Sequence, residues 1–360
     1  EIQNVVSIIN PIFTEGKHVL ARSDDKNTIN FAKIVLSLSK KKNIDIYVTG
    51  SNSKMLSTDV QTEFRDKATV IDVSPLSFEE FINYTKLDEY RAINEYLIYG
   101  GMPLTVLKET EVEKKNYLIN LFETTYLKDI LERYKFKKSE ALDELCSLLS
   151  TCVGTLINSE KLTNTYKSKT KNKIDSETVT SYINAFKDSH IIREASRYDV
   201  KGKGIISSLK KYYFVDNGLR NARLNFAYVD EGQMLENVVY NELIYNGYTV
   251  NVGTYDKIEK NQNKESIRKT YEIDFLATKG SRMYYIQVAS DISNEDTRNR
   301  EIKPYISLYD QIQKIIVINR PINEMRDNYG FTVIGIVDFL LRFIKWKRIF
   351  YDKIRVSKGQ

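Results

Sequence analysis

The sequence predicts a multidomain α/β protein, and three patterns along the chain support that prediction. Residues 28–42 carry apolar residues at helical spacing and lead into a short apolar strand at residues 44–48. Residues 140–198 hold three helical patterns followed by a strand, and residues 271–289 hold two strands of alternating apolar residues joined by a turn. A length of 360 residues is enough for two or three domains.

The composition narrows the chemistry that the chain can perform. No run of about 18 apolar residues occurs and the first residues do not resemble a signal peptide, so we expect a cytoplasmic protein without a membrane span. Two cysteines and two histidines are too few for a disulfide framework, a four-ligand zinc site or a histidine-based metal centre. Catalysis would therefore depend on carboxylates, amides, lysines and arginines. A net charge of +6 permits contact with nucleic acid without requiring it.

The first third of the chain has the order of elements expected of an open α/β sheet. The strand at residues 44–48 ends in the polar cluster Thr49-Gly50-Ser51-Asn52-Ser53, and open α/β sheets place ligands at the carboxyl ends of their strands. A further strand is predicted at residues 70–73, and an acidic helix start follows at Glu79. An ordinary strand–loop–helix connection with normal capping explains the same pattern equally well.

A helical connector is predicted over residues 87–138, and residues 139–205 then follow a pattern typical of a winged helix. That pattern has two short helices, a third helix with polar residues facing outward, and a hairpin. Winged helices bind DNA in many proteins, whereas in others they only pack domains together. If this one contacts nucleic acid, the third helix and the hairpin turn would supply the contacts. The candidate residues are Thr178, Ser181, Lys187, Lys201 and Lys203.

The strand pair at residues 271–289 contains a candidate metal site. Metal-dependent nucleases place an Asp on one strand, and an acidic or amide group on its neighbour, as ligands of a divalent cation. Asp274 and Gln287 occupy such positions. The lysine that usually follows two residues after the second ligand is replaced by Ala289, and Lys279 in the turn is a weak substitute.

The elements around this pair predict an α/β sandwich. A helix over residues 231–246 precedes the pair, and a charged helix over residues 296–306 and two more strands follow it. Residues 257–269 are expected to form a polar insertion. Strict alternation along the first strand of the pair places three apolar side chains on one face. These side chains are Tyr271, Ile273 and Phe275.

Several motifs follow one another along the chain. They are Glu1-Ile2-Gln3, Tyr47-Val48-Thr49-Gly50-Ser51-Asn52-Ser53-Lys54-Met55-Leu56-Ser57, Pro75-Leu76-Ser77-Phe78, Tyr99-Gly100-Gly101-Met102-Pro103, Lys211-Tyr212-Tyr213-Phe214-Val215-Asp216, Leu235-Glu236-Asn237, Glu272-Ile273-Asp274-Phe275 and Ile286-Gln287-Val288. In this order they resemble the predicted AAA-type ATPases of bacteria and archaea, which carry a C-terminal domain of unknown function. The resemblance covers nearly the whole chain.

The resemblance implies an N-terminally truncated member of that family with several domains. Residues 1–86 would be the remnant of a P-loop AAA-type α/β domain, followed by the helical connector and the winged helix. Residues 206–342 would form an α/β domain related to the restriction endonucleases, and residues 343–360 a basic tail. The tail interleaves aromatic and basic residues, a pattern that permits contact with a membrane or nucleic acid, but a short basic helix packed on its own domain is the preferred interpretation.

The resemblance also implies roles for N-terminal residues. Glu1 would be the Walker B glutamate that polarises the attacking water. Arg65 and Lys67 stand where the family has two arginines, and Arg65 is the better candidate for a trans-acting arginine because a lysine lacks the bidentate fork. No G-x-x-x-x-G-K-[ST] motif occurs in the sequence, so ATP and Mg²⁺ are expected for the intact protein and no cofactor for this fragment alone. The residues that would sense the γ-phosphate are Thr49, Ser51 and Asn52.

In the C-terminal domain, the resemblance implies that Glu236, Asp274 and Gln287 stand at the positions of nuclease metal ligands. Gln287 brings no charge and Ala289 no ammonium group, so we expect a degenerate site. Two other interpretations of the acids stay open, namely that Glu236 caps its helix and that Asp274 forms a hydrogen bond within its domain.

The expected function is that of an ATP-binding ATPase that couples its nucleotide state to a DNA or protein partner. The ATPase domain could also mediate self-association. A metal-dependent DNA nuclease or nucleic-acid-binding module is one alternative, and a non-enzymatic interaction scaffold is another. Metal-dependent cleavage and ATP binding are the two activities that separate these functions.

Overall fold

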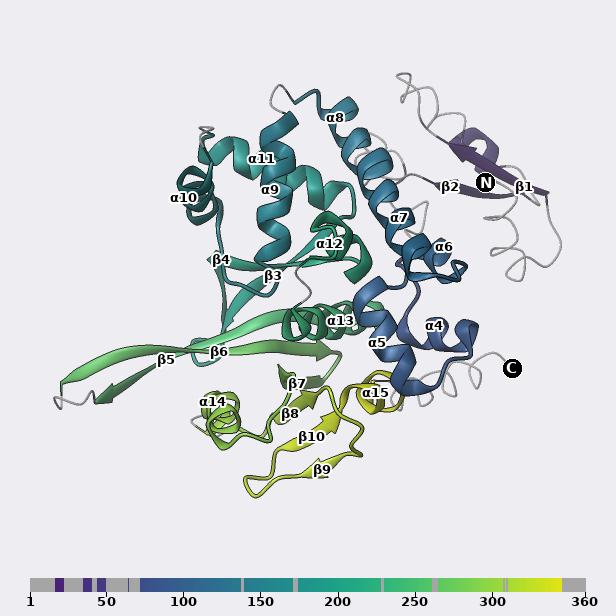
Figure 1. Cartoon of the computed structure of the whole chain (residues 1–360). Coiled ribbons are helices and arrows are strands. Elements are labelled where there is room, and N and C mark those ends of the chain that lie inside the picture. Colours follow the sequence, from purple (N-terminus) through teal and green to yellow (C-terminus); the bar gives the residue numbers. More distant parts are fainter. Residues whose placement is uncertain are drawn as a thin grey trace. The chain divides into compact units, whose positions relative to one another are not determined.

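A computed structural model describes residues 17–22, 35–40, 44–49, 64, 72–136, 139–170, 174–227, 230–260, 265–306, 308 and 310–344 (Figure 1). The chain divides into two compact units, which comprise Glu1–Val73 with Asp188–His190, and Ser74–Lys187 with Ile191–Gln360. In the first unit, β1 (Lys17–Arg22) and β2 (Ile44–Thr49) pair in parallel. The strand predicted at residues 44–48 is thus confirmed as β2.

The second unit is organised around an eight-stranded mixed sheet with the strand order β4-β3-β5-β6-β7-β8-β10-β9. The strands are β3 (Ile192–Asp199), β4 (Gly204–Phe214), β5 (Thr249–Lys260), β6 (Ser266–Lys279), β7 (Arg282–Ala289), β8 (Gln313–Ile318), β9 (Met325–Arg326) and β10 (Thr332–Gly335). Strands β7, β8 and β10 run parallel, whereas β3–β4, β5–β6 and β6–β7 are antiparallel pairs. The predicted mixture of helices and strands is therefore found, with one mixed sheet in this unit.

The helices of the second unit come before, between and after its strands along the chain. They are α4 (Phe78–Thr85), α5 (Glu89–Tyr99), α6 (Pro103–Val106), α7 (Glu111–Leu121), α8 (Lys128–Tyr134), α9 (Ser139–Thr151), α10 (Ser159–Lys169), α11 (Ser176–Asp188), α12 (Asn217–Arg223), α13 (Glu231–Tyr245), α14 (Glu295–Ile306) and α15 (Ile336–Asp338), with π-helical turns η3 (Phe122–Leu127) and η4 (Phe339–Phe343). Within the described ranges, no helix is both long and apolar enough to cross a membrane.

Two hydrophobic cores lie on opposite faces of the sheet. Ile315 and Val317 of β8 belong to the larger core, which includes residues of α4, α5 and α7 to α13. Ile316 and Ile318 belong to the smaller core, which includes Ile302 of α14. Because successive side chains of a strand point to opposite faces, this division shows that the sheet is covered on both sides. An α/β sandwich is the architecture that the sequence predicts for this region.

The segment that enters the second unit begins with a strong helix-start signal. The Ser77 hydroxyl accepts the backbone N–H of Glu80 at 3.3 Å, and the Glu80 carboxylate accepts the backbone N–H of Ser77 at 2.8 Å. This capping box satisfies two backbone donors that the first turn of a helix otherwise leaves free. The acidic helix start predicted at this point is confirmed as the first turn of α4.

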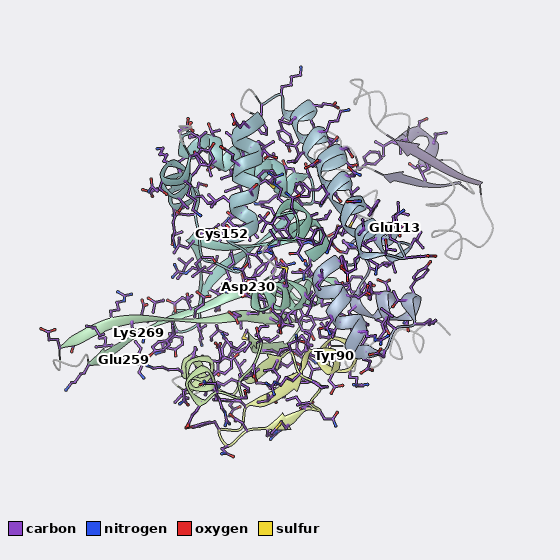
Figure 2. All side chains as sticks on the ribbon, viewed as in Figure 1. Tyr90, Glu113, Cys152, Asp230, Glu259 and Lys269 are labelled. Carbon is purple, nitrogen blue, oxygen red and sulfur yellow. The ribbon has the colours of Figure 1, made fainter. Side chains whose placement is uncertain are left out.

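Of the polar insertion predicted at residues 257–269, residues 257–260 and 266–269 instead extend β5 and β6, and residues 261–264 lie outside the described residues. The two strands stay paired as far as Lys260 opposite Ser266, and they form an arm that projects from the sheet (Figure 1). The labelled side chains of Glu259 and Lys269 lie on this arm (Figure 2). The charged residues at 257–260 and 266–269 are therefore side chains of paired strands.

Candidate functional site

The residues predicted to act on nucleotide belong to the first unit. Of these, Thr49 is the last residue of β2, and nothing is described of its side chain. The others lie outside the described residues, so their roles stay predictions. They are Glu1, Ser51, Asn52, Arg65 and Lys67.

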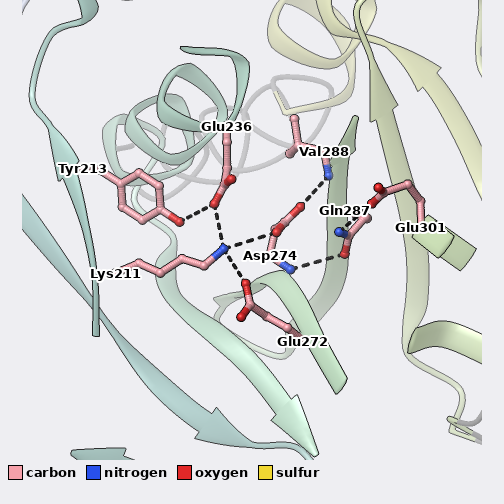
Figure 3. A network of polar contacts seen from close by, with 8 residues as sticks. All are labelled: Lys211, Tyr213, Glu236, Glu272, Asp274, Gln287, Val288 and Glu301. Atoms are coloured by element: carbon pink, nitrogen blue, oxygen red, sulfur yellow. Dashed lines mark hydrogen bonds and ion pairs between the residues drawn. The ribbon is translucent and has the colours of Figure 1, made fainter. Parts of the chain in front are cut away.

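In the second unit, three carboxylates surround the ammonium group of Lys211 on β4 (Figure 3). Its Nζ lies 2.9 Å from Oε1 of Glu236 on α13, 2.7 Å from Oε1 of Glu272 and 3.3 Å from Oδ1 of Asp274, the last two on β6. The lysine is buried, with 1% of its surface exposed. Two of the three predicted metal ligands, Glu236 and Asp274, are therefore brought together, and a lysine lies between them.

A β-bulge determines where Asp274 lies. Asn251 of β5 pairs with Leu276 of β6, whereas Gly253 pairs with Ile273, so Asp274 and Phe275 together oppose a single residue. Phe275 consequently packs in the larger core while Ile273 packs in the smaller one, and the prediction that these residues share a face is wrong. Bulges commonly re-aim a side chain next to a functional site. Here the bulge falls at the acid that contacts Lys211.

The carboxylates have further hydrogen bonds that fix their positions. The Tyr213 hydroxyl donates to Oε1 of Glu236 at 2.7 Å, and the backbone N–H of Val288 donates to Oδ2 of Asp274 at 2.9 Å. Asp230, and not Glu236, caps α13, since its side chain accepts the backbone N–H of Gln233. Of the two other interpretations of these acids, the structure thus supports the hydrogen bond within the domain for Asp274.

Gln287 lies on the other side of Asp274 from the lysine (Figure 3). Its Oε1 accepts the backbone N–H of Asp274 at 3.4 Å, and its Nε2 donates to the Glu301 carboxylate of α14 at 2.9 Å. Ala289 is buried in the smaller core, and Lys279 donates to the backbone carbonyl of Asn246 at 2.6 Å. The role of Gln287 as a metal ligand stays a prediction.

The charged groups of the cluster shift one another's pKa values. Burial and the neighbouring Glu236 raise the pKa of Asp274 to about 7. Burial by itself would lower the pKa of Lys211, but the three carboxylates outweigh it and raise that pKa above its ordinary value. The lysine therefore remains charged, and the acids depend on it for compensation.

The side chains present do not fit a divalent cation. Oxygen ligands bind Mg²⁺ and Ca²⁺ at about 2.0–2.6 Å, and several oxygens must converge on one point. In this cluster the point of convergence holds the ammonium group of Lys211. Among the residues that the structure describes, no group of three or more His, Cys, Asp or Glu side chains could hold a metal ion.

Sequence reasoning had no role for Lys211, although the lysine opens one of the motifs quoted above. It is 63 residues from Asp274 in the chain, so no local spacing relates them. One signal was available: alternation places Lys211 on the same face of its strand as Tyr213, and a lysine on a buried face requires anionic partners.

Two of the residues predicted to contact nucleic acid have partners within the chain. The ammonium group of Lys187 lies 2.6 Å from the Glu194 carboxylate, and that of Lys201 lies 4.6 Å from the centre of the Tyr255 ring. Strand β3 pairs with β5 as well as β4, so the hairpin is part of the large sheet. The winged helix and its DNA contacts stay predictions. Of the remaining candidates, Ser181 and Lys203 are exposed and Thr178 is half-buried.

Two other buried carboxylates each accept a backbone N–H from the segments that precede the sheet. The Asp216 carboxylate accepts the backbone N–H of Gly101 at 2.6 Å and that of Leu219 at 3.1 Å. Glu242 of α13 accepts the backbone N–H of Phe78 at 2.5 Å. Burial is the main cause that raises the pKa of Asp216 to about 6 and that of Glu242 to about 7.

Comparison with known proteins gives two domain matches. Residues 3–82 match the AAA domain family, and residues 90–230 match a domain of unknown function, DUF8612. The chain was also matched to a solved structure, the crystal structure of protein VC1899 from Vibrio cholerae. The alignment covers 95% of this chain and 94% of that chain, at 13% sequence identity. Its TM-score of 0.23 is too low to support an argument about the fold.

Two uncharacterized proteins are similar to this chain over most of its length. One, from Methanocaldococcus jannaschii, is 29% identical over 289 residues, which are 77% of this chain and 62% of that protein. The other, from Haemophilus influenzae, is 32% identical over 315 residues, which are 86% of this chain and 74% of that protein. The chain therefore belongs to the same family as the Haemophilus influenzae protein. In this chain, the match to the AAA domain precedes the match to the domain of unknown function.

Proposed function

We propose that the protein is an AAA-type ATPase that couples its nucleotide state to a DNA or protein partner of its second unit. The AAA match supports the nucleotide chemistry, since that family implies ATP and Mg²⁺ in general. In this proposal Glu1 polarises the attacking water, and Arg65 acts on the nucleotide of a neighbouring copy. The residues that sense the γ-phosphate are Thr49, Ser51 and Asn52.

The observation that favours coupling is that the AAA match continues into the second unit. The match ends at residue 82, and its residues 74–82, which include the start of α4, belong to that unit. The backbone N–H of Leu76 donates to the carbonyl of Gly101 at 2.8 Å, and that of Phe78 donates to the Glu242 carboxylate. A movement at the end of the AAA domain would therefore act directly on buried hydrogen bonds of the second unit.

For the second unit we propose binding without cleavage. Gln287 supplies an amide where a nuclease has an acid. Two residues later, where a nuclease usually has a lysine, the chain has Ala289. The Asp274 carboxylate is engaged by Lys211 and by the backbone of β7. With Mg²⁺ or Mn²⁺, the protein is expected to leave supercoiled plasmid intact, and cleavage that is lost in Asp274→Ala would make the nuclease alternative correct.

The ATPase proposal is tested with the chain expressed from the complete reading frame. Binding of a fluorescent ATP analogue and release of phosphate are measured with Mg²⁺ for the wild type and for Glu1→Gln. We expect both chains to bind the nucleotide. Hydrolysis should fall by about 10²–10⁴-fold in the variant, because it lacks the group that polarises water.

Coupling is tested on the same preparation by hydrogen exchange. Binding of a non-hydrolysable ATP analogue should change the exchange of the backbone amide of Phe78, because that amide lies where the AAA match enters the second unit. The matched control is the amide of Gln233, which the exposed cap Asp230 accepts at 2.9 Å. Absence of nucleotide binding would refute the ATPase, whereas binding without a change at Phe78 would refute only the coupling.

A further inference from the structure

We propose that the ammonium group of Lys211 takes the place of a divalent cation in the acidic cluster, and that its presence is what keeps such cations out. Lys211 would then be the residue that converts a nuclease-like arrangement of acids into a cluster closed to metal. The proposal concerns the chemistry of β4, β6 and α13, so it does not depend on the nucleotide chemistry proposed above.

The first support is the match between donors and acceptors. A lysine ammonium group has three N–H donors and no acceptor. The cluster presents one carboxylate oxygen to each donor, from Glu236, Glu272 and Asp274, at 2.9, 2.7 and 3.3 Å. The first two are ordinary lengths for charge-assisted hydrogen bonds, and all three are too long for a metal–oxygen bond. The arrangement thus suits an ammonium group in both number and distance.

The second support is burial together with charge. The Lys211 side chain is 2% exposed, while Glu236 and Asp274 are 15% and 10% exposed. Acids that are so little exposed need compensation from a cation or from hydrogen-bond donors, and here the ammonium group of Lys211 contacts both of them. A metal ion at the same point would meet a like charge from the lysine, so the two cations exclude each other.

The surrounding bonds hold the acids in place when the lysine is replaced. The Tyr213 hydroxyl fixes Glu236, and the backbone N–H of Val288 fixes Asp274 on the side away from the lysine. Glu272 is more exposed, at 40% of its side chain, which gives the cluster an opening to solvent. Removal of the ammonium group would leave converging carboxylate oxygens, the ligand type that Mg²⁺ and Mn²⁺ prefer.

The experiment compares Mn²⁺ binding by the wild type and Lys211→Met, with the full chain, by calorimetry and by electron paramagnetic resonance of free Mn²⁺. Methionine keeps an unbranched chain of similar length and removes the charge. We expect no saturable Mn²⁺ site at the cluster in the wild type. In Lys211→Met we expect one saturable site that binds Mn²⁺ at least about tenfold more tightly than any residual binding by the wild type, and this site should be lost again in Lys211→Met/Asp274→Asn.

The matched control is Lys210→Met, which removes the neighbouring lysine, whose partner is Glu194 and not the cluster. It should bind Mn²⁺ like the wild type. Wild-type binding that Asp274→Asn abolishes would overturn the proposal, and so would a folded Lys211→Met that binds no better than the wild type. If Lys211→Met unfolds without metal, recovery of the fold by Mn²⁺ supports the proposal and failure to recover overturns it.

Discussion

Two groups of carboxylates in the second unit contain buried members, and the charge of these acids is compensated differently in each group. Around Lys211, the acids face a cation, and the lysine Nζ lies within 3.3 Å of each of them. Elsewhere in the unit, Asp216 accepts the backbone N–H groups of Gly101 and Leu219, and Glu242 accepts that of Phe78.

The two groups of carboxylates differ in what compensates their negative charge. Ion pairing makes the first cluster dependent on one side chain, because loss of the lysine leaves several uncompensated charges. Backbone donors compensate a charge only in part, so burial still raises the pKa of Asp216 to about 6 and of Glu242 to about 7. Mutation of the lysine cluster should therefore change the stability strongly, whereas Asp216 and Glu242 should make the stability depend on pH near neutrality.

The largest effect is expected for Lys211→Met. Breaking a buried ion pair by removal of one partner costs about 3–5 kcal/mol, and this lysine serves three acids. The free energy of unfolding is measured by urea denaturation in the presence of a chelator. Lys210→Met removes a pair with Glu194 in which both side chains are about a quarter exposed, so it should cost only about 0–1 kcal/mol. Similar losses in the two variants would contradict this view of the cluster.

A smaller effect is expected for Asp216→Ala. The substitution removes the N-cap of α12 and also leaves the buried N–H of Gly101 without its acceptor. Loss of a cap costs about 0.5–2 kcal/mol and an unsatisfied buried donor about 1–3 kcal/mol. Asp88→Ala removes an exposed N-cap, that of α5, and should cost only the first amount. If urea denaturation gives equal losses, the bond to Gly101 does not stabilise the connector.

The smallest effect is the pH dependence due to Glu242. Its pKa is about 7 in the folded chain against an ordinary 4.5, so the folded state binds more protons between these values. Its contribution is therefore fully present below about pH 4.5 and is lost as the pH rises through about 7, with a slope of at most about 1.4 kcal/mol per unit. Glu242→Gln should remove this slope and be more stable than the wild type at pH 8.

The control for this titration is Glu132→Gln, since Glu132 is exposed and pairs only with Lys128 at 3.9 Å in the described part of the chain. Thermal unfolding of the three chains between pH 4.5 and 8 separates the contribution of Glu242 from those of other groups. A Glu242→Gln variant that keeps the wild-type pH profile would mean that the carboxylate is not ionised differently in the folded chain.

Much of the second unit could be predicted from local patterns. The hairpin of β6 and β7, helix α13 and the acidic start of α4 all appear where periodicity and capping residues place them. These features depend on neighbours in sequence, which alternation and caps report directly. The bulge at Asp274 escaped prediction because it depends on the register between β5 and β6, and nothing in β6 alone specifies that register.

The candidate site was predicted in part. Glu236 and Asp274 were expected together and do share the cluster, whereas Gln287 lies on the far side of Asp274 and bonds Glu301. The partner that changes the chemistry, Lys211, could not be placed, because it comes from a strand whose neighbours are decided by the fold of the whole unit.

By itself, then, the sequence determined the kinds of element present and the order of the motifs. Those properties depend on composition and on short spacings. Only the tertiary structure decided which charges meet: an ammonium group from β4 lies among acids of α13 and β6, 25 to 63 residues away in the chain. Buried charges require compensating partners, and only the fold brings such partners near; for these acids the partner is a lysine.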